Sequence, residues 1–203
     1  MRSKAAVLLA TLFLMMAFTG NSLVAQEKQG DAAMQEMMKK WQAAITPGQP
    51  HKALASMEGS WTAEVQSWMS GPDAPPMVSK GTSTMKMVFG GRYLQQDFTG
   101  EMMNMPFSGM GFTGYDNVNK KYVGIWMDNM STGISTMEGS MNQAGSTLTM
   151  YGKMDDPTTG EHGKNIKYVS KVLGPDKQVF DVYDLSLDDA KSKMMEITYT
   201  RVK

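Results

Sequence analysis

The chain contains no cysteine and only two histidines among its 203 residues. The absence of cysteine excludes disulfide bonds, thiolate metal ligands and cysteine nucleophiles. The two histidines, His51 and His162, lie far apart in the sequence and form no pair at metal-ligand spacing. We therefore predict no metal site and no cofactor. Stability must come from packing and backbone hydrogen bonds, which a chain of this length can supply.

Long apolar runs are also lacking, because none approaches the roughly 20 residues of a comfortable membrane span. The apolar stretch 5–18 follows the cations Arg2 and Lys4 and leads to the small residue Ala25, a pattern typical of a secretory signal peptide. We expect residues 1–25 to be removed by cleavage near Ala25. The mature protein is then expected to be periplasmic or secreted, with no membrane span.

The sequence has no excess of charge of either sign, since 20 Lys and Arg balance 20 Asp and Glu. Removal of the expected signal peptide takes away two cations and no acid, which leaves the mature chain slightly acidic. Such a balance gives no electrostatic reason to expect a nucleic-acid partner. The composition favours no particular oligomeric state.

Methionine, in contrast, is abundant, with 23 residues. Its flexible and polarizable side chain fills irregular cores and also suits apolar surfaces that accept ligands of varied shape. Thioethers can bind Cu(I), and Met102, Met103 and Met105, or Met127 and Met130, are the nearest approach to a cluster. Because the other methionines are scattered over most of the chain, we favour core filling or cavity lining over copper binding.

Residues 26–50 are expected to form an N-terminal helix and a linker. Asp31 can cap a helix that runs to about Ala44, and its apolar residues fall on one stripe at three- and four-residue spacing. That stripe comprises Met34, Met37, Met38, Trp41 and Ile45. The sequence from Thr46 to Pro50, which holds two prolines and a glycine, ends the helix.

Residues 51–203 are expected to form one β-domain that begins with a short turn over 51–57. Segments of alternating character, separated by turn residues, predict about ten strands. Their ranges are 61–69, 78–89, 92–102, 107–115, 121–129, 133–141, 146–154, 164–173, 178–186 and 192–202. No long helical pattern separates them, so the sheet is antiparallel, and closure removes its edges. The prediction is an all-β, roughly ten-stranded antiparallel barrel with an N-terminal α-helix.

The two ends of this β-domain carry residues suited to closing a barrel. Gly59 and Trp61 open the first predicted strand, and Arg201 lies in the last one. In a closed barrel the Trp side chain can plug one end while the Arg guanidinium lies on its ring face. Such a cation–π contact stabilises by roughly 0.5–2 kcal/mol.

Several short motifs in this domain occur together in one family. They are His51-Lys52-Ala53-Leu54 leading to Gly59-Ser60-Trp61, Phe89-Gly90-Gly91-Arg92-Tyr93-Leu94, Pro106-Phe107-Ser108-Gly109, Gly114-Tyr115-Asp116, Lys121-Tyr122 to Trp126-Met127-Asp128, and Thr198-Tyr199-Thr200-Arg201. From about His51 to Arg201 the chain resembles the bacterial family called domain of unknown function 1579. That family is similar to the calycin barrels, which include lipocalins, fatty-acid-binding proteins and nitrobindins.

The resemblance implies a calycin-like barrel and carries no agreed activity. Nitrobindin-like barrels hold haem through a histidine near the barrel opening. Neither His51 nor His162 falls on a late predicted strand, so the chain departs from that pattern.

No catalytic residue is predicted. Acidic residues such as Asp97, Glu101, Asp116, Asp128 and Glu138 could form an acid/base pair only if the fold brought two of them together. The sequence holds no nucleophile-elbow context and no phosphate-binding glycine pattern before a helix. An enzyme is therefore the least favoured of the functions considered.

The favoured function is that of an exported protein that binds a small apolar or amphipathic molecule inside the barrel. Barrels of about this strand number leave room for one small ligand. Met85, Met87, Phe89, Trp126 and Tyr168 are the candidate wall residues, because they are large, soft or aromatic and lie on predicted strands. The alternative is a structural or stress-related envelope protein whose barrel is filled by its own side chains.

Overall fold

The computed structural model describes residues 30–68, 71, 73–157, 159–188 and 192–203. The chain divides into two units, Met1–Thr46 and Pro47–Lys203, and the expected signal peptide lies outside the described residues. In the first unit residues 30–45 form a helix, which confirms the N-terminal helix predicted from Asp31 to about Ala44. None of the helices in the described ranges combines the length and the apolar character needed to cross a bilayer.

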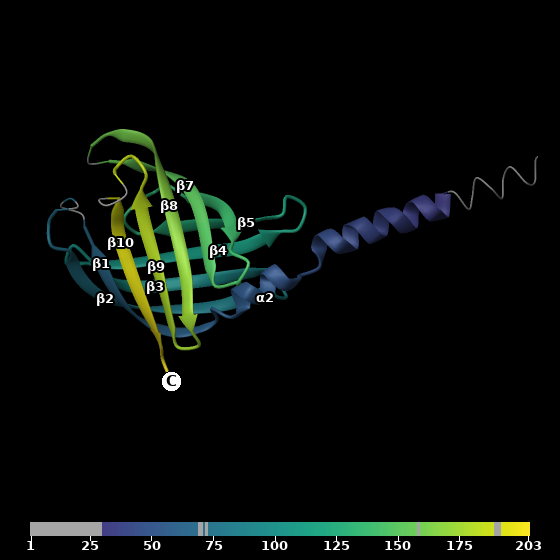
Figure 1. The fold of residues 1–203 in the computed structure, drawn as a ribbon, viewed down its shortest axis with the longest axis horizontal. Coiled ribbons are helices and arrows are strands. Elements are labelled where there is room, and N and C mark those ends of the chain that lie inside the picture. Colours follow the sequence, from purple (N-terminus) through teal and green to yellow (C-terminus); the bar gives the residue numbers. More distant parts are fainter. Residues whose placement is uncertain (1–29, 69–70, 72, 158, 189–191) are drawn as a thin grey trace, which may run out of the picture. The chain divides into compact units, whose positions relative to one another are not determined.

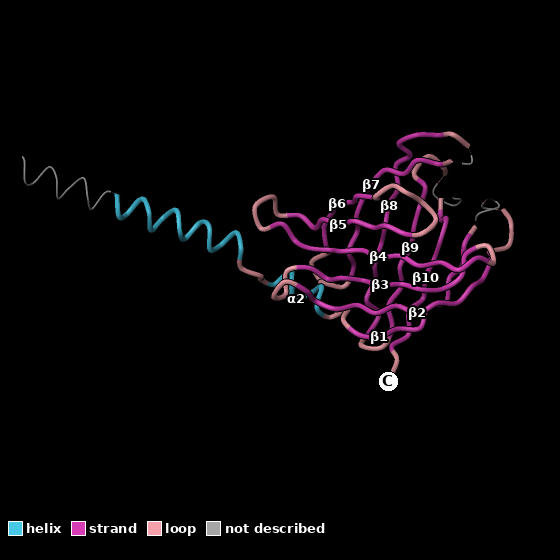
Figure 2. The backbone as a smooth tube through the Cα atoms, turned by 180° about the vertical axis from the view of Figure 1, so that it is seen from behind, coloured by secondary structure: helices cyan, strands magenta, loops and turns pink. Residues whose placement is uncertain are grey.

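Ten strands of the second unit form a closed antiparallel barrel (Figures 1 and 2). Each strand pairs with its neighbour in sequence, and β1 pairs with β10 to complete the closure, so no strand edge is left unpaired. The strands are β1 Gly59–Ser67, β2 Met77–Val88, β3 Tyr93–Met102, β4 Met105–Asp116, β5 Lys121–Asp128, β6 Ser135–Met141, β7 Thr147–Asp156, β8 Glu161–Gly174, β9 Lys177–Asp184 and β10 Lys193–Arg201. The predicted all-β barrel is thus confirmed.

The alternation of buried and exposed residues along β1 shows which of its positions face the interior of the barrel. Trp61, Ala63 and Val65 are buried, whereas the residues between them, Thr62 and Glu64, are exposed. Antiparallel pairing carries this assignment around the barrel, because residues directly opposite each other point to the same face. Every strand can therefore be divided into inward-facing and outward-facing positions from the register.

One end of the barrel is covered by the short helix α2, Gln49–Ala55, where the sequence had predicted a turn over 51–57. Pro50 lies in its first turn, a position that tolerates the missing N–H of proline. Leu54 is fully buried and Met57 nearly so, and both belong to the barrel core. The indole Nε1 of Trp61 donates to the carbonyl oxygen of Met57 at 3.1 Å, which ties this segment to β1.

We call the end covered by α2 the closed end and the opposite end the open end. β1 runs from the closed end to the open end, and each following strand reverses this direction. The connections at the open end therefore include residues 103–104, 129–134 and 185–188. The closed end holds the turns after β2, β4, β6 and β8, together with the last residues of the chain.

A charged cluster lies on outward-facing positions of β8, β9 and β10. Asp181 is fully buried there, and its two carboxylate oxygens each lie 2.8 Å from a lysine Nζ, one of Lys171 and one of Lys193. The ring of Tyr183 lies beside this cluster, with the Nζ of Lys167 4.4 Å from its centre. The stems of these lysines and the tyrosine ring account for a buried carboxylate on the outside of a barrel.

Candidate functional site

Aromatic side chains on the inward-facing positions lie flat against glycines of neighbouring strands. The benzene part of Trp126 in β5 covers Gly109 and Gly111 of β4. A Cβ added at Gly109 would lie 2.2 Å from the Cζ2 of Trp126, and one at Gly111 would lie 2.8 Å from its Cε3. Glycine is required at both positions because any side chain would collide with the ring.

Phe98 of β3, on the same inner face, lies against two glycines in a similar way. A Cβ at Gly81 of β2 would lie 2.6 Å from the Cζ of Phe98, and one at Gly100 would lie 3.1 Å from its Cε1. The Phe98 ring meets Phe107 of β4 edge to face, with 5.8 Å between the ring centres. The rings of Phe98 and Trp126 are therefore held against the wall of the barrel.

A second aromatic pair lies on β8 and β9. Tyr168 and Phe180 are stacked, with ring centres 6.2 Å apart and an angle of 16° between the rings. A Cβ at Gly152 would lie 3.3 Å from the Cε2 of Tyr168, so glycine again allows the close approach. Burial raises the pKa of the Tyr168 hydroxyl, which keeps it protonated and uncharged at neutral pH.

Several of these inward-facing residues are only partly buried. In a closed barrel an inward-facing side chain is shielded from the outside, so its exposed part faces the interior or the open end. The large apolar residues in this condition are Met87, Phe107, Tyr115, Trp126, Met137, Met141, Tyr168, Val172, Phe180 and Met195. Other inward-facing residues are buried, among them Trp61, Leu148 and Tyr199 at the closed end.

Inside the barrel a small polar network crosses from β2 to β10. The Nε2 of Gln96 lies 3.1 Å from the hydroxyl of Tyr199 and 3.2 Å from the Oγ of Ser83. Burial raises the pKa of the Tyr199 hydroxyl, although its hydrogen bond with Gln96 acts in the opposite direction. This hydroxyl is therefore neutral and serves to satisfy a buried amide rather than to exchange protons.

Among the described residues, charged side chains reach inward only near the two ends. At the open end Lys164 donates to Asp184 at 2.7 Å, and its Nζ also lies 3.5 Å from Glu161 and 3.8 Å from Asp156. The hydrogen bond to Asp184 raises the pKa of the Lys164 ammonium. Burial alone would raise the pKa of Asp184, but hydrogen bonds from Lys164 and Ser186 hold it below its ordinary value. Both partners are therefore charged at neutral pH.

Asp128 also faces inward at the open end, beside Trp126. The indole Nε1 of Trp126 donates to the Oδ2 of Asp128 at 2.9 Å, and the backbone N–H of Met130 donates to Oδ1 at 2.9 Å. The hydrogen bond fixes the orientation of the indole ring. It also places a carboxylate at the edge of a partly exposed aromatic face.

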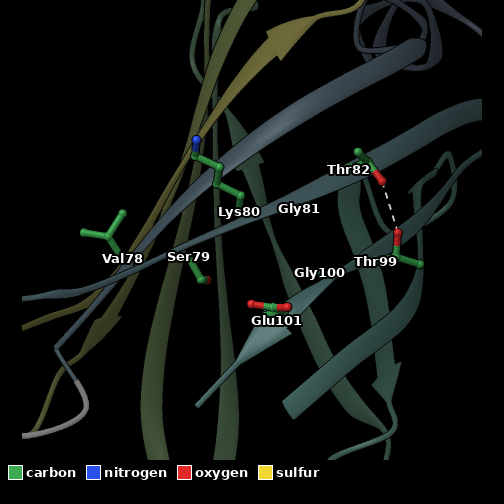
Figure 3. A pocket seen from close by; sticks show the side chains of 8 residues that line it. All are labelled: Val78, Ser79, Lys80, Gly81, Thr82, Thr99, Gly100 and Glu101. Atoms are coloured by element: carbon green, nitrogen blue, oxygen red, sulfur yellow. Dashed lines mark hydrogen bonds between the residues drawn. The ribbon is translucent and has the colours of Figure 1, made fainter. Parts of the chain in front are cut away.

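An open groove of about 760 Å³ lies elsewhere, where β2 pairs with β3 (Figure 3). Its lining residues are Val78, Ser79, Lys80, Gly81, Thr82, Thr99, Gly100 and Glu101. The hydroxyls of Thr82 and Thr99 are 3.0 Å apart and bond to each other across it, and its charged side chains are exposed. The groove thus lacks the apolar walls and the buried polar groups that fix a small molecule in a site.

The five predicted wall residues take different places. Trp126 of β5 and Tyr168 of β8 both lie on the partly exposed inner wall. Strands β6 and β7 lie between their two strands. Met85 and Met87 also face inward but lie toward the closed end, where Met85 is buried and accepts a contact from the amide of Gln178 at 3.6 Å. Phe89 lies in the turn after β2, is 72% exposed and does not face the interior.

The three residues proposed for barrel closure lie together at the closed end. Trp61 and Arg201 are paired in register between β1 and β10, and the guanidinium carbon lies 4.1 Å from the centre of the indole ring. Gly59 has φ of 137°, and a Cβ there would lie 2.1 Å from the Nη1 of Arg201. Glycine is thus required both by the backbone conformation and by the guanidinium.

Within the described ranges, no group of three or more His, Asp or Glu side chains is arranged to hold a metal ion. His51 is buried against Tyr115 at the closed end, whereas His162 is exposed on β8 at the open end. The chemistry that the interior does offer is apolar contact, aromatic faces and a few fixed charges at the open end.

The family model described as "Protein of unknown function (DUF1579)" matches residues 46–201. No curated protein matches the chain. The crystal structure of Rv2717c from M. tuberculosis is similar, with a TM-score of 0.52 and 13% identity over 78% of this chain and 100% of that one. A redesigned β-barrel and a de novo designed fluorescence-activating β-barrel also match, both with TM-scores of 0.41, at 12% and 11% identity. Each match covers 74% of this chain, and 96% and 97% of the two designs respectively. At its identity, the similarity to Rv2717c shows the barrel fold alone.

Proposed function

This chain belongs to the DUF1579 family of proteins of unknown function, and we propose that it binds one small apolar or amphipathic molecule inside its barrel. One observation carries the proposal. Several large side chains of the inner wall between β4 and β10, Trp126, Met137 and Tyr168 among them, remain partly exposed although they face the inside of a closed barrel. A barrel filled by its own side chains would bury them.

The glycine positions are a second support for interior space. Trp126 lies against Gly109 and Gly111 of β4, and Phe98 lies against Gly81 of β2 and Gly100 of its own strand, so both rings occupy room that side chains at those positions would otherwise take. Each ring therefore covers the wall instead of extending across the barrel. Barrels with eight or more strands can hold one small ligand in the space that is left.

The chemistry of the wall indicates an apolar or amphipathic ligand. Aromatic faces and methionine thioethers dominate it, and both adapt to apolar groups of varied shape. α2 covers one end of the barrel, which leaves the open end as the route of entry. The charged residues Asp128, Lys164 and Asp184 lie at that end, where a polar part of the ligand would remain close to water.

We also propose that the protein works outside the cytoplasm. Arg2 and Lys4, the apolar stretch 5–18 and the small residue Ala25 support export followed by cleavage. Fractionation of the native cells, with the intact mass of the purified protein, tests this. We expect the envelope or medium fraction to hold a protein whose mass matches a chain that starts at Gln26. An uncleaved chain in the cytoplasm would overturn this part of the proposal.

Binding is tested with Nile red, an uncharged apolar dye whose fluorescence rises in apolar surroundings. We expect saturable binding to the purified protein and at least tenfold weaker binding to Trp126→Ala and to Tyr168→Ala, because each loses an aromatic face. Tyr151→Ala is the matched control, since Tyr151 lies on an outward-facing position of β7 and is 52% exposed. Absence of saturable binding, or equal binding by folded wall variants, would overturn the proposal in favour of a filled barrel.

A further inference from the structure

We propose that the ligand is an amphipathic cation, whose positively charged head lies at Trp126 and Asp128 while its apolar part lies against the inner wall. This inference rests on the proposed function and names the ligand class of that same site. It follows from the charges that face inward. On the inward-facing positions of the ten strands, the charged residues that the structure describes are Asp128, Asp156, Glu161, Lys164, Asp184 and Arg201.

The two inward-facing cations already have partners. Arg201 lies at the closed end on the Trp61 ring and donates to the carbonyl oxygens of Glu58 and of Pro175, the latter at 2.7 Å. Lys164 lies at the open end within 2.7 Å of Asp184 and within 4.0 Å of two more carboxylates. A carboxylate or phosphate ligand would therefore have to displace an existing ion pair to gain a cation.

The balance at the open end is negative. Among the described residues, Asp128, Asp156, Glu161 and Asp184 face inward there, against the one ammonium of Lys164. A cation entering through this end is attracted, and an anion is repelled. Because the interior has a lower dielectric constant than water, these charges act more strongly on a bound head group than they would on an exposed surface.

Trp126 and Asp128 together form the features that recognise an ammonium group. In the described part of the chain Asp128 makes hydrogen bonds with Trp126 and Met130 and no ion pair. The Trp126 ring rests on Gly109 and Gly111 and is only partly buried, so interior space lies next to it. Aromatic faces attract ammonium groups, Trp most strongly, and a neighbouring carboxylate adds a direct charge.

Three amphiphiles with the same twelve-carbon tail test the proposal. Dodecyltrimethylammonium, dodecanol and dodecanoate are titrated as monomers against the purified protein by competition with Nile red. We expect the ammonium compound to bind about tenfold more tightly than dodecanoate, with dodecanol between them. If all three bind equally, or if dodecanoate binds best, the cation inference is overturned while the interior site stands. If none competes with the dye, the proposed site itself is overturned.

Two charge variants localise the head group. Asp128→Asn should weaken binding of the ammonium compound about three- to tenfold and leave binding of dodecanol unchanged, because only the charged head group loses a partner. Glu101→Gln is the matched control, since Glu101 is an exposed, outward-facing carboxylate near the same end. An equal effect of both variants would show that the general negative charge, and not a site at Asp128, attracts the cation. Trp126→Phe, which keeps a ring but removes the hydrogen bond to Asp128, gives the same readout if Asp128→Asn fails to fold.

Discussion

The guanidinium of Arg201 lies over the ring of Trp61, with 4.1 Å between the guanidinium carbon and the ring centre. The two residues are opposite each other in β10 and β1, so this contact forms where the last strand closes on the first. Arg201 also donates to the carbonyl oxygens of Glu58 and Pro175. One side chain therefore holds together β1, the turn between β8 and β9, and the end of the chain.

We expect Arg201→Met to lower the free energy of unfolding by about 2–4 kcal/mol. The variant loses a cation–π contact of about 1 kcal/mol and two hydrogen bonds to carbonyl oxygens, which contribute about 0.5–1.5 kcal/mol each. Urea denaturation followed by tryptophan fluorescence measures the change. Lys203→Met serves as the control, because the Lys203 side chain is 85% exposed, and it should change stability by less than about 0.5 kcal/mol. Equal stability of the two variants would show that the closed end does not depend on Arg201.

The stability of the protein should decrease as the pH falls below about 6.5, through His51. Burial lowers the pKa of His51 from its ordinary value of 6.5, a contact with the Tyr115 backbone raises it in part, and the charge of Arg92 lowers it further. The neutral ring accepts a hydrogen bond from the N–H of Gly48 at 3.0 Å. Because the folded pKa lies below the unfolded one, the unfolded state binds more protons, so stability is lost as the pH falls through the folded pKa.

Urea denaturation between pH 8 and pH 5.5 measures this dependence. His51→Gln keeps an acceptor at the third position of α2 but cannot titrate, so its stability should vary less over this range. His162→Gln is the matched control, since His162 is exposed, and it should keep the dependence of the parent chain. If the slope is the same in the parent and in His51→Gln, another group is responsible.

Asp181→Ala should be among the most destabilising single substitutions on the outer surface. Burial would raise the pKa of Asp181, but hydrogen bonds from Lys171 and Lys193 hold it below its ordinary value, so the carboxylate is charged when folded. The substitution removes the carboxylate that both lysines bind. Because the two lysines are partly exposed and can be hydrated, we expect the free energy of unfolding to fall by about 2–3 kcal/mol. Chemical denaturation measures it against Glu64→Ala, an exposed carboxylate on β1. A loss no larger than that of the control would contradict this account.

The fold could be predicted from the sequence because its signals are local. Alternating residues and turn residues placed each strand within a few positions of its observed bounds, and the closing pair Trp61 and Arg201 was visible as one motif at each end. Phe89 is the wall residue that does not follow the predicted alternation. Its spacing from Met85 and Met87 predicts a shared face, but β2 ends at Val88 and Phe89 adopts φ of 51° in the turn. A residue beyond the last ladder pair no longer follows the alternation of the strand.

The candidate site was less predictable because it depends on contacts between distant residues. Trp126 and Tyr168 were identified by residue type, but the glycines that Trp126 covers, Gly109 and Gly111, lie on another strand. Lys164 and Asp184 likewise come together only through the pairing of β8 with β9. Glycines spaced two apart within a predicted strand were the available signal. Such a spacing predicts one smooth face but does not say which ring covers it.

Gly109→Val should abolish Nile red binding while the protein remains folded. The added side chain would occupy the place of the Trp126 ring, which then has to swing away from the wall into the interior. Overpacking of this kind costs typically about 1–3 kcal/mol, which leaves a barrel of this size folded. The displaced indole would fill the space that the ligand is proposed to occupy. Dye titration and urea denaturation measure the two effects separately.

Gly133→Ala is the matched control, because a Cβ at Gly133 has no atom within 4 Å and the residue lies in a connection at the same end. It should bind the dye like the parent chain. The double variant Gly109→Val, Trp126→Leu removes the displaced ring and should recover dye binding in part, since the smaller side chain no longer blocks the interior. If Gly109→Val binds normally, the Trp126 ring does not border the ligand site. If the double variant folds but binds no better than Gly109→Val, the loss came from distortion of β4 and not from the indole ring.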